Sequence, residues 1–419
     1  MVPSRLWSAR GLMLVCVCSV MFGVYLRVQE LAYPPALTFD EHHFVENARN
    51  YLAGKADWND HPPLGKLLIA AAIAWHGDDS VGWRSVPLGF GLLSIVLAYF
   101  LGRALTRDPL AGAFAAAFVA LDGFLIAFSR TALLDGMLTA LALGCVLALS
   151  LGRGWWRALA VGVLLGLTAS IKFSGVTLLL PCAWIVLSSR ERWPVRSAQF
   201  SLVCALGLLV FYAQYALGRV LSGQGAAPSD VVAATRVLVV HHLGLTQMTH
   251  PLTSHWYTWW LPTRPITLRF DWVEGRQIRA MSSLGNPLLW WTSTAAMLAS
   301  LGSLLWLGAR RLMQPSTRDQ PRELHTQARV LVGLAWVGFL SPWILTARDS
   351  YIYHYLPAYA LGLVWLGGLV AQGHRRWPRA CLVFVSVVVA VSIFYAPVWA
   401  QLPISPRGYD LRLFLHRWR

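Results

Sequence analysis

The chain has 419 residues, of which 56% are hydrophobic and only 13% are charged. A soluble domain is usually close to one quarter charged, so this composition excludes an ordinary soluble protein. The formal net charge of +16 could indicate a nucleic-acid partner. However, the arginines occur in short clusters between apolar runs and not along one soluble face, which is typical of a membrane protein and argues against nucleic acid.

Apolar runs long enough to cross a bilayer recur along the whole chain. We therefore predict an all-α polytopic membrane protein with about 11 transmembrane helices, at residues 11–28, 82–103, 109–128, 131–150, 156–172, 175–188, 197–218, 284–308, 328–346, 353–371 and 379–399. The first run resembles a signal peptide, but no clear small-residue cleavage site follows it, so we expect a retained span. The six cysteines all lie in apolar runs without metal-ligand spacing and are expected to be small core residues.

The distribution of basic residues predicts the orientation of the spans. With the N-terminus in the cytoplasm, every cytoplasmic segment carries arginine: Arg5, Arg10, Arg103, Arg107, Arg153, Arg157, Arg190, Arg192, Arg196, Arg310, Arg311, Arg318, Arg322, Arg329, Arg375, Arg376 and Arg379. The tail after residue 400 breaks this rule, because it lies outside and carries Arg407, Arg412, Arg417 and Arg419. The chain is thus predicted to form one transmembrane domain over residues 1–419, with a first outer loop at 29–81 and a second at 219–283.

The first outer loop contains the longest polar stretch in this half of the chain, residues 38–66. Asp40 and Glu41 are adjacent carboxylates where the loop meets the membrane surface, and a base there could take a proton from an acceptor hydroxyl. The plainer alternative is that both are solvated loop acids. His42 and His43 follow them, and the stretch ends with HPPLGK, residues 61–66.

The HPPLGK sequence predicts a stiff turn into a helix that lies in the membrane interface. His61 and Lys66 would flank that turn as supporting residues, although Lys66 could also be a lysine that merely extends toward the headgroups. Further along, Arg130 and Asp135 are about one helical turn apart across the start of a span. Because an acid inside a membrane needs a partner, we predict that Asp135 pairs with Arg130, either to orient it toward a phosphate or as a purely structural ion pair.

Other polar groups are predicted on the same outer side. Lys172 ends the fifth predicted span, and Arg348 and His354 precede or begin the tenth. The HWYTWWLP run, residues 255–262, is expected to be an interfacial helix or loop with tryptophans at headgroup level. A single cation at a helix end is often only a membrane anchor, but acids, cations and aromatic rings together on one face suit a reaction on a lipid-linked anionic substrate.

Seven segments in order resemble the motif series of the protein O-mannosyltransferases, which belong to the C-type membrane glycosyltransferases: FDEHHF, HPPLGKLLIA, SRTALLDGML, GLTASIKFSG, SHWYTWWLP, GNPLLWW and YIYHYLPAY. The resemblance extends from residue 39 to 359. It implies transfer of mannose, with inversion, from a polyprenyl-phosphate donor to Ser or Thr hydroxyls of exported proteins. It also implies that no cofactor or catalytic metal is needed.

The same resemblance implies roles for individual residues. Asp40 would be the catalytic base, and Glu41 would support the acceptor site. Arg130 would bind the lipid phosphate, and Lys172 and His354 would lie on the donor side. From their positions in the sequence, we also expect Arg348 to bind the donor phosphate and Asp135 to act in support. His255, Trp256 and Tyr257 would belong to the acceptor loop. Eukaryotic members carry a MIR-repeat domain in the outer loop that corresponds to residues 219–283; this loop is short here, which indicates a bacterial-type member and leaves the acceptor open.

Three other hypotheses remain. A related enzyme could modify a lipid or glycan instead of a protein, as aminoarabinose transferases do. A transporter would place its polar groups near the bilayer midplane within repeated halves, which this sequence does not indicate. A metal site formed by His42, His43 or His255 is conceivable, although no spacing requires one. We predict a multi-pass protein of the bacterial inner membrane with its active site on the periplasmic face.

Overall fold

A computed structural model describes residues 9–56, 58, 60–152, 154–245, 250–313, 324–346 and 348–418. The predicted cytoplasmic residues Arg5, Arg153, Arg318 and Arg322, and Arg419 of the tail, lie outside this part of the chain. Within it, nine helices are long and apolar enough to cross a membrane: α1 (Ala9–Val28), α4 (Ser80–Thr106), α7 (Leu134–Leu151), α8 (Gly154–Ile171), α10 (Trp193–Leu221), α12 (Pro287–Met313), α13 (Leu324–Leu345), α14 (Leu356–His374) and α15 (Pro378–Ala400).

The other two predicted spans have irregular structures. The third is a pair of helices, α5 (Pro109–Leu121) and α6 (Gly123–Ser129), bent by 65° at Asp122. The sixth is a 3-10 helix, η2 (Phe173–Leu178), that continues into the short α9 (Leu179–Leu187). The bend has a local cause: the carboxylate of Asp122 accepts hydrogen bonds from the N–H groups of Phe124 and Leu125 and so begins a new helix.

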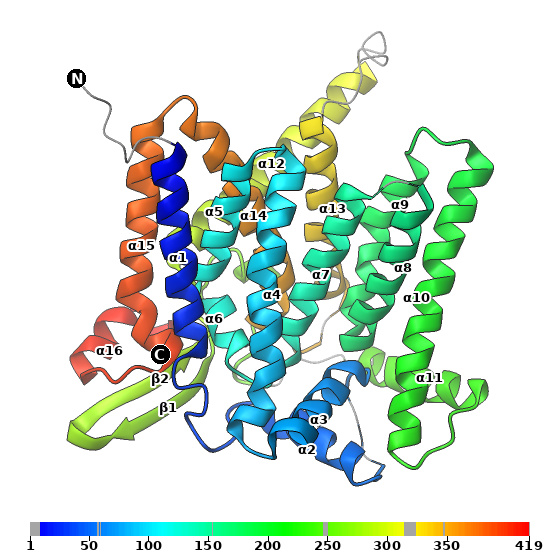
Figure 1. Ribbon diagram of the computed structural model, residues 1–419, viewed down its shortest axis with the longest axis horizontal. Coiled ribbons are helices and arrows are strands. Elements are labelled where there is room, and N and C mark those ends of the chain that lie inside the picture. Colours follow the sequence, from blue (N-terminus) through cyan, green and yellow to red (C-terminus); the bar gives the residue numbers. More distant parts are fainter. Residues whose placement is uncertain are drawn as a thin grey trace.

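The polar segments predicted outside the membrane gather at one end of the bundle (Figure 1). They include α2 (Glu41–Leu52), α3 (Leu64–His76), α11 (Pro228–Gly244) and α16 (Pro406–Arg412). The segments predicted outside the membrane also contain four short 3-10 helices, η3 (Trp256–Thr258), η4 (Glu274–Arg276), η6 (Ile352–Tyr355) and η7 (His416–Trp418). The end of α4, which carries the predicted cytoplasmic Arg103, and the end of α14, which is followed by Arg375, lie at the opposite end (Figure 1). Successive long helices alternate in direction, and their orientation relative to the cytoplasm stays a prediction.

The second outer loop contains a feature that the sequence reasoning missed. Strands β1 (Thr267–Val273) and β2 (Gln277–Ser282) form an antiparallel hairpin, with Phe270 opposite Ala280. Ile278 of β2 also exchanges backbone hydrogen bonds with Ile404, at N···O distances of 2.8 and 2.9 Å. The hairpin thus connects the second loop to the segment that follows α15 (Figure 1).

The centre of the bundle is formed by α5 and α14, which are buried on nearly all sides. Gly367 of α14 permits their close contact, since a Cβ atom there would lie 2.6 Å from the backbone nitrogen of Ala115. In contrast, α10 is mostly exposed and apolar, as a lipid-facing helix should be. The expectation of buried cysteines is wrong for Cys18, which is exposed on α1, and Cys204 is only half-buried.

Candidate active site

The candidate active site is a cavity of about 700 Å³ at the polar end of the bundle. Its walls come from the start of α2, the break between α8 and η2, the ends of α11 and α13, and the segment before α14. Five of the predicted site residues line it together: Asp40, His61, Lys172, Arg348 and His354. Segments more than 300 residues apart in the chain therefore form one site, as residues 40 and 348 illustrate.

Asp40 is placed in this cavity by an unusual turn. The preceding Phe39 has φ of +45°, a left-handed conformation that an aromatic residue rarely adopts. Asp40 then begins α2, but its carboxylate makes no capping hydrogen bond. Burial raises the pKa of Asp40 above its usual range, whereas the nearby charges of His43 and Lys172 act in the opposite direction. The group is thus an ionisable carboxylate that faces the cavity.

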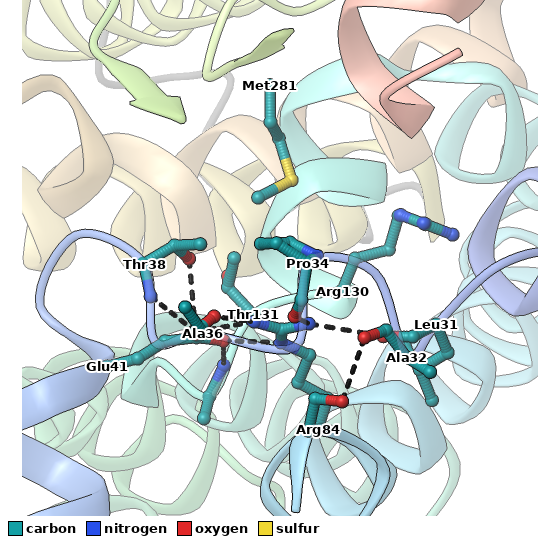
Figure 2. Close-up of polar contacts among 12 residues, drawn as sticks. Leu31, Ala32, Pro34, Ala36, Thr38, Glu41, Arg84, Arg130, Thr131 and Met281 are labelled. Carbon is teal, nitrogen blue, oxygen red and sulfur yellow. Dashed lines mark hydrogen bonds and ion pairs between the residues drawn. The ribbon is translucent and has the colours of Figure 1, made fainter. Parts of the chain in front are cut away.

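Glu41 does not line the cavity, which differs from its predicted place at the acceptor site. It is fully buried and forms an ion pair with Arg84 of α4, with both N···O distances 2.8 Å. The carboxylate of Glu41 also accepts hydrogen bonds from the N–H and the hydroxyl of Thr38 (Figure 2). It accepts a further hydrogen bond from the N–H of Ala132. Glu41 therefore holds the loop before Asp40 against α4 and the turn before α7.

Arg84 completes this junction and was missed by the sequence reasoning. Its guanidinium also donates to the carbonyl groups of Leu31, Pro34 and Ala36, so it ties the first outer loop to α4 (Figure 2). Two signals in the sequence could have indicated the pair. An arginine inside a predicted span requires a partner, and Thr38 and Glu41 have the spacing of a helix capping box.

The predicted pairing of Asp135 with Arg130 is wrong. Asp135 instead forms an ion pair with Lys172, whose Nζ atom lies 2.9 and 2.8 Å from the two carboxylate oxygens. Both side chains are nearly buried, and the ammonium group also lies over the ring of Tyr353, 5.4 Å from its centroid. Asp135 and Tyr353 thus hold Lys172, which in turn lines the cavity that Asp40 faces.

Arg130 has a different set of partners. Its guanidinium donates to the carbonyls of Leu26, Arg27, Gln29 and Glu30, at and just after the end of α1. These carbonyls have no partner within the helix, so Arg130 acts as a cap for α1. It is 2% exposed and is not among the residues that line the cavity. This geometry supports a structural role in place of the predicted contact with the donor phosphate.

Arg348 is oriented by a histidine that the sequence reasoning did not single out. Its Nη1 atom lies 2.6 Å from Nδ1 of His242 on α11, and Nε2 of His242 lies 2.7 Å from the carbonyl oxygen of Asp60. Arginine can only donate, so Nδ1 accepts and Nε2 carries the proton. Burial, together with the charge of Arg348, lowers the pKa of His242, which keeps the ring neutral and able to accept. In the sequence, only the adjacent histidines His241 and His242 could have indicated a polar site at this position.

His354 lies at the cavity wall in a defined tautomer. Its Nδ1 atom accepts the N–H of Tyr351 at 3.1 Å, so Nε2 carries the hydrogen and can donate to a ligand. Its ring stacks on Trp343, with the ring centroids 3.6 Å apart and an interplanar angle of 11°. Trp343 also lies 6.0 Å from the guanidinium of Arg348. One aromatic ring thus positions two predicted donor-binding residues.

His61 and Lys66 have positions consistent with support of the loop. The Nζ atom of Lys66 donates to the carbonyl oxygen of His61. Lys66 is fully buried, so it does not extend toward the headgroups. Burial, with the nearby charges of Lys172 and Lys66, holds the pKa of His61 well below its usual range. His61 is therefore neutral at physiological pH and cannot supply a positive charge to the cavity.

The predicted acceptor-loop residues lie away from the cavity lining. His255, Trp256 and Tyr257 form the start of η3, and the His255 and Tyr257 rings stack on each other. The nearby Trp259 is fully buried in the protein, whereas Tyr257 is exposed; the location of this run at headgroup level stays a prediction. The loop is fastened to the cavity wall because Ser254 and Ser350 exchange two hydrogen bonds of 2.8 Å.

His42 and His43 stack on each other, with their ring centroids 3.8 Å apart, and His43 lines the cavity. Among the described residues, no group of three or more histidine, cysteine or acidic side chains is arranged to hold a metal ion. A metal site built from His42, His43 and His255 therefore receives no geometric support from this part of the chain. Independence from metals stays a prediction.

Two family models cover almost the whole chain. Residues 17–219 match the dolichyl-phosphate-mannose-protein mannosyltransferases, and residues 229–418 match the C-terminal four-helix membrane region of the protein-O-mannosyltransferases. The chain belongs to the protein O-mannosyltransferase family. It is a multi-pass membrane protein of this family, and the predicted motif series is confirmed at the level of family membership.

Relatives and solved structures agree with this assignment. The chain is 28% identical to the polyprenol-phosphate-mannose–protein mannosyltransferase of Mycobacterium tuberculosis, covering 99% of this chain and 92% of the relative. It is 24% identical to the enzyme of the same name from Corynebacterium glutamicum, covering 91% and 88%. Its fold resembles the donor-bound Pmt1–Pmt2 complex of Saccharomyces cerevisiae (TM-score 0.80, 14% identity, 100% of this chain and 93% of that chain). It also resembles ArnT of Cupriavidus metallidurans bound to undecaprenyl phosphate (TM-score 0.55, 14% identity, 97% and 76%).

Proposed function

We propose that this protein O-mannosyltransferase transfers mannose from a polyprenyl-phosphate donor to Ser or Thr hydroxyls of exported proteins. The observation that carries the assignment to this cavity is that the carboxylate of Asp40 lines it together with two anchored cations, Lys172 and Arg348. A transfer of this kind requires a base for the hydroxyl and positive charge for the departing phosphate. The named activities of the relatives support the choice of mannose and of a protein acceptor.

In the proposed reaction, the acceptor oxygen attacks the anomeric carbon while the bond from that carbon to the phosphate oxygen breaks. Asp40 takes the hydroxyl proton, and the electron pair of the broken bond goes to polyprenyl phosphate. Attack from the face opposite the leaving group inverts the configuration at the carbon. Lys172, Arg348 and the N–H of His354 stabilise the charge that grows on the phosphate. The burial of Asp40 suits its role as the base, because burial raises the pKa of its carboxyl group and a higher pKa makes the carboxylate a stronger base.

The test is transfer by the purified full-length chain in lipid nanodiscs. Polyprenyl-phosphate-mannose is supplied together with a Ser/Thr-rich peptide from an exported protein. We expect the peptide to gain one hexose, and a peptide with alanine at every Ser and Thr to gain none. A folded enzyme that transfers mannose only to lipid or glycan acceptors would contradict the protein acceptor and favour the lipid-modifying alternative.

The cavity is proposed to face the periplasm of the bacterial inner membrane. The arginines at the opposite end of the bundle support this orientation. The orientation is tested with two single-cysteine substitutions, Lys55→Cys at the polar end and Arg376→Cys at the other end. A membrane-impermeant maleimide should label only the first in intact spheroplasts; labelling of the second alone would reverse the orientation.

A further inference from the structure

A second cavity, of about 740 Å³, lies at the opposite end of the bundle from Asp40. It is formed where α4, α7 and α9 end and where α8 and α13 begin. These ends point away from α2, α3 and α11 (Figure 1). The proposed transfer reaction makes no use of this cavity, since none of the residues that line the catalytic cavity also lines it.

The charge of the second cavity is positive. Arg103 and Arg107 of the α4 terminus and Arg157 of α8 line it, and none of the described lining residues is a carboxylate. The nearby Asp108 is already engaged, because it caps α5 and pairs with Arg375 at 3.0 Å. Arg103 and Arg107 are exposed and Arg157 is buried, and all three line the same concave space. The catalytic cavity differs in that it balances its cations with Asp40 and Asp60.

The remaining walls fit an amphipathic molecule. Phe100, Leu105, Ile185 and Leu331 supply apolar surface. Ser189 also lines the cavity, and its hydroxyl oxygen is buried without a hydrogen-bond partner among the described residues. A buried hydroxyl without a partner is costly, so it marks a position where a ligand oxygen could accept. The cavity thus offers arginine donors, a hydroxyl donor and apolar walls together.

We propose that this cavity binds the headgroup of an anionic phospholipid from the adjacent leaflet. Arginine donates two parallel hydrogen bonds to phosphate oxygens, and no carboxylate among the described lining residues competes with a ligand for Arg103 and Arg107. The acyl chains lie along the apolar walls. Basic pockets between transmembrane helices at a cytoplasmic surface have this recognition chemistry. The bound lipid belongs to the leaflet opposite the proposed catalytic site, so the inference does not depend on the transfer reaction.

Native mass spectrometry of the purified full-length chain with phosphatidylglycerol or phosphatidylcholine tests the proposal. We expect saturable binding of phosphatidylglycerol, weakened about fivefold by Arg107→Gln and about 100-fold when Arg103, Arg107 and Arg157 are all changed to Gln. The control is Arg376→Gln, at the same end of the bundle but outside the cavity, which should bind as wild type. Arg107→Gln alone keeps the test valid if the triple variant fails to fold, since Arg107 is exposed.

Three outcomes would overturn the proposal. The first is equal binding of phosphatidylglycerol by the wild type and by Arg107→Gln. The second is equal affinity for phosphatidylcholine, which would show that the net negative charge of the headgroup does not matter. The third is full displacement of the lipid by millimolar inorganic phosphate, which would assign the cavity to a free anion in place of a phospholipid.

Discussion

Asp40 and Glu41 are neighbours in the chain, yet they lie in two different parts of the molecule. Asp40 faces a cavity of about 700 Å³ that also contains Lys172 and Arg348. Glu41 is fully buried and its carboxylate is saturated by Arg84, Thr38 and Ala132. One step along a helix rotates a side chain by about 100°. That rotation separates a carboxylate free to take part in chemistry from one that holds the loop in place.

The environment of each acid therefore determines its role. The carboxylate of Glu41 already accepts hydrogen bonds from Arg84, Thr38 and Ala132, so a further donor would have to displace one of them. The cavity around Asp40 has cations that are held by other residues, as Asp135 holds Lys172 and His242 holds Arg348. Substitutions in the cavity and substitutions at the junction should therefore have different effects. Cavity changes should alter turnover or donor affinity, and junction changes should alter folding.

Replacement of the proposed base should have the largest effect. Asp40→Asn preserves the shape of the side chain but removes the proton acceptor, so turnover should fall about 100- to 10,000-fold. Donor affinity and melting temperature should stay near wild type, as measured by ligand binding and thermal unfolding. Glu46→Gln, at an exposed position of the same helix α2, is the matched control. Normal transfer by Asp40→Asn would remove Asp40 as the base.

Replacement of Arg84 should destabilise the fold. Arg84→Met leaves the carboxylate of Glu41 buried without its ion-pair partner, which typically costs about 3–5 kcal/mol. The double variant Glu41→Leu with Arg84→Met should recover part of the loss. The exposed pair of Arg49 with Asp78 is the control, because Arg49→Met should cost only about 0–1 kcal/mol. Chemical unfolding in detergent provides the measurement, and equal losses at both pairs would contradict the structural role of the junction.

Replacement of Arg348 should act on the donor. Arg348→Gln removes a charged donor of hydrogen bonds, a change typically equivalent to about 1.5–3 kcal/mol, so donor affinity should weaken about 10- to 150-fold. Steady-state kinetics should show this mainly as a higher KM for polyprenyl-phosphate-mannose. Arg407→Gln, exposed on α16 at the same end of the bundle, should behave as wild type. An unchanged donor KM in Arg348→Gln would exclude contact with the phosphate.

The pH dependence of transfer should report on Asp40. The base must be ionised, so activity is constant above the pKa of Asp40 and falls about tenfold per pH unit below it. Because burial raises this pKa, the acid limb should lie above 3.8, the ordinary value of an aspartate. Rates measured from pH 4 upward, at about constant ionic strength, should show the limb in the wild type. Persistence of the same limb in the residual activity of Asp40→Asn would assign it to another group.

Replacement of His242 should have the smallest effect. His242→Leu removes the acceptor that orients Arg348, a hydrogen bond worth about 1 kcal/mol, so the donor KM should rise about fivefold with little change in kcat. His242→Asn restores an acceptor near the position of Nδ1 and should recover most of the loss. His76→Leu, exposed at the end of α3, is the control. Equal behaviour of the Leu and Asn variants would argue against the orienting hydrogen bond.

The sequence alone predicted the helical membrane fold, the positions of most spans and the end of the bundle where the polar groups gather. It could do so because apolar length and arginine placement are local properties of a chain in a bilayer. It did not predict the 65° bend at Asp122, although an acid followed by glycine inside an apolar run was a visible signal. The carboxylate of Asp122 also accepts hydrogen bonds from the hydroxyl of Tyr359 and the N–H of Asn286, and both residues are distant in sequence.

Five of the predicted site residues come together in one cavity, but the partners of the charged groups were not predictable from spacing. Arg130 and Asp135 are about one helical turn apart in sequence, but their separation exceeds the three or four residues that place two side chains together on a helix. The chain also turns between α6 and α7 and directs them to different neighbours. Asp135 pairs with Lys172, and Arg130 pairs with the end of α1. Spacing specifies neighbours within one helix, whereas these partners lie on other helices.

Residue types and their order in the chain determined the family, the span pattern and the candidate acid at position 40. The packing of distant segments places Asp40 at the cavity, pairs Glu41 with Arg84 and brings His242 against Arg348. The physical reason is that a buried charge must be matched by whatever donor the packed helices bring within about 3 Å. That donor is selected by the folding of distant segments against each other and not by their separation in sequence.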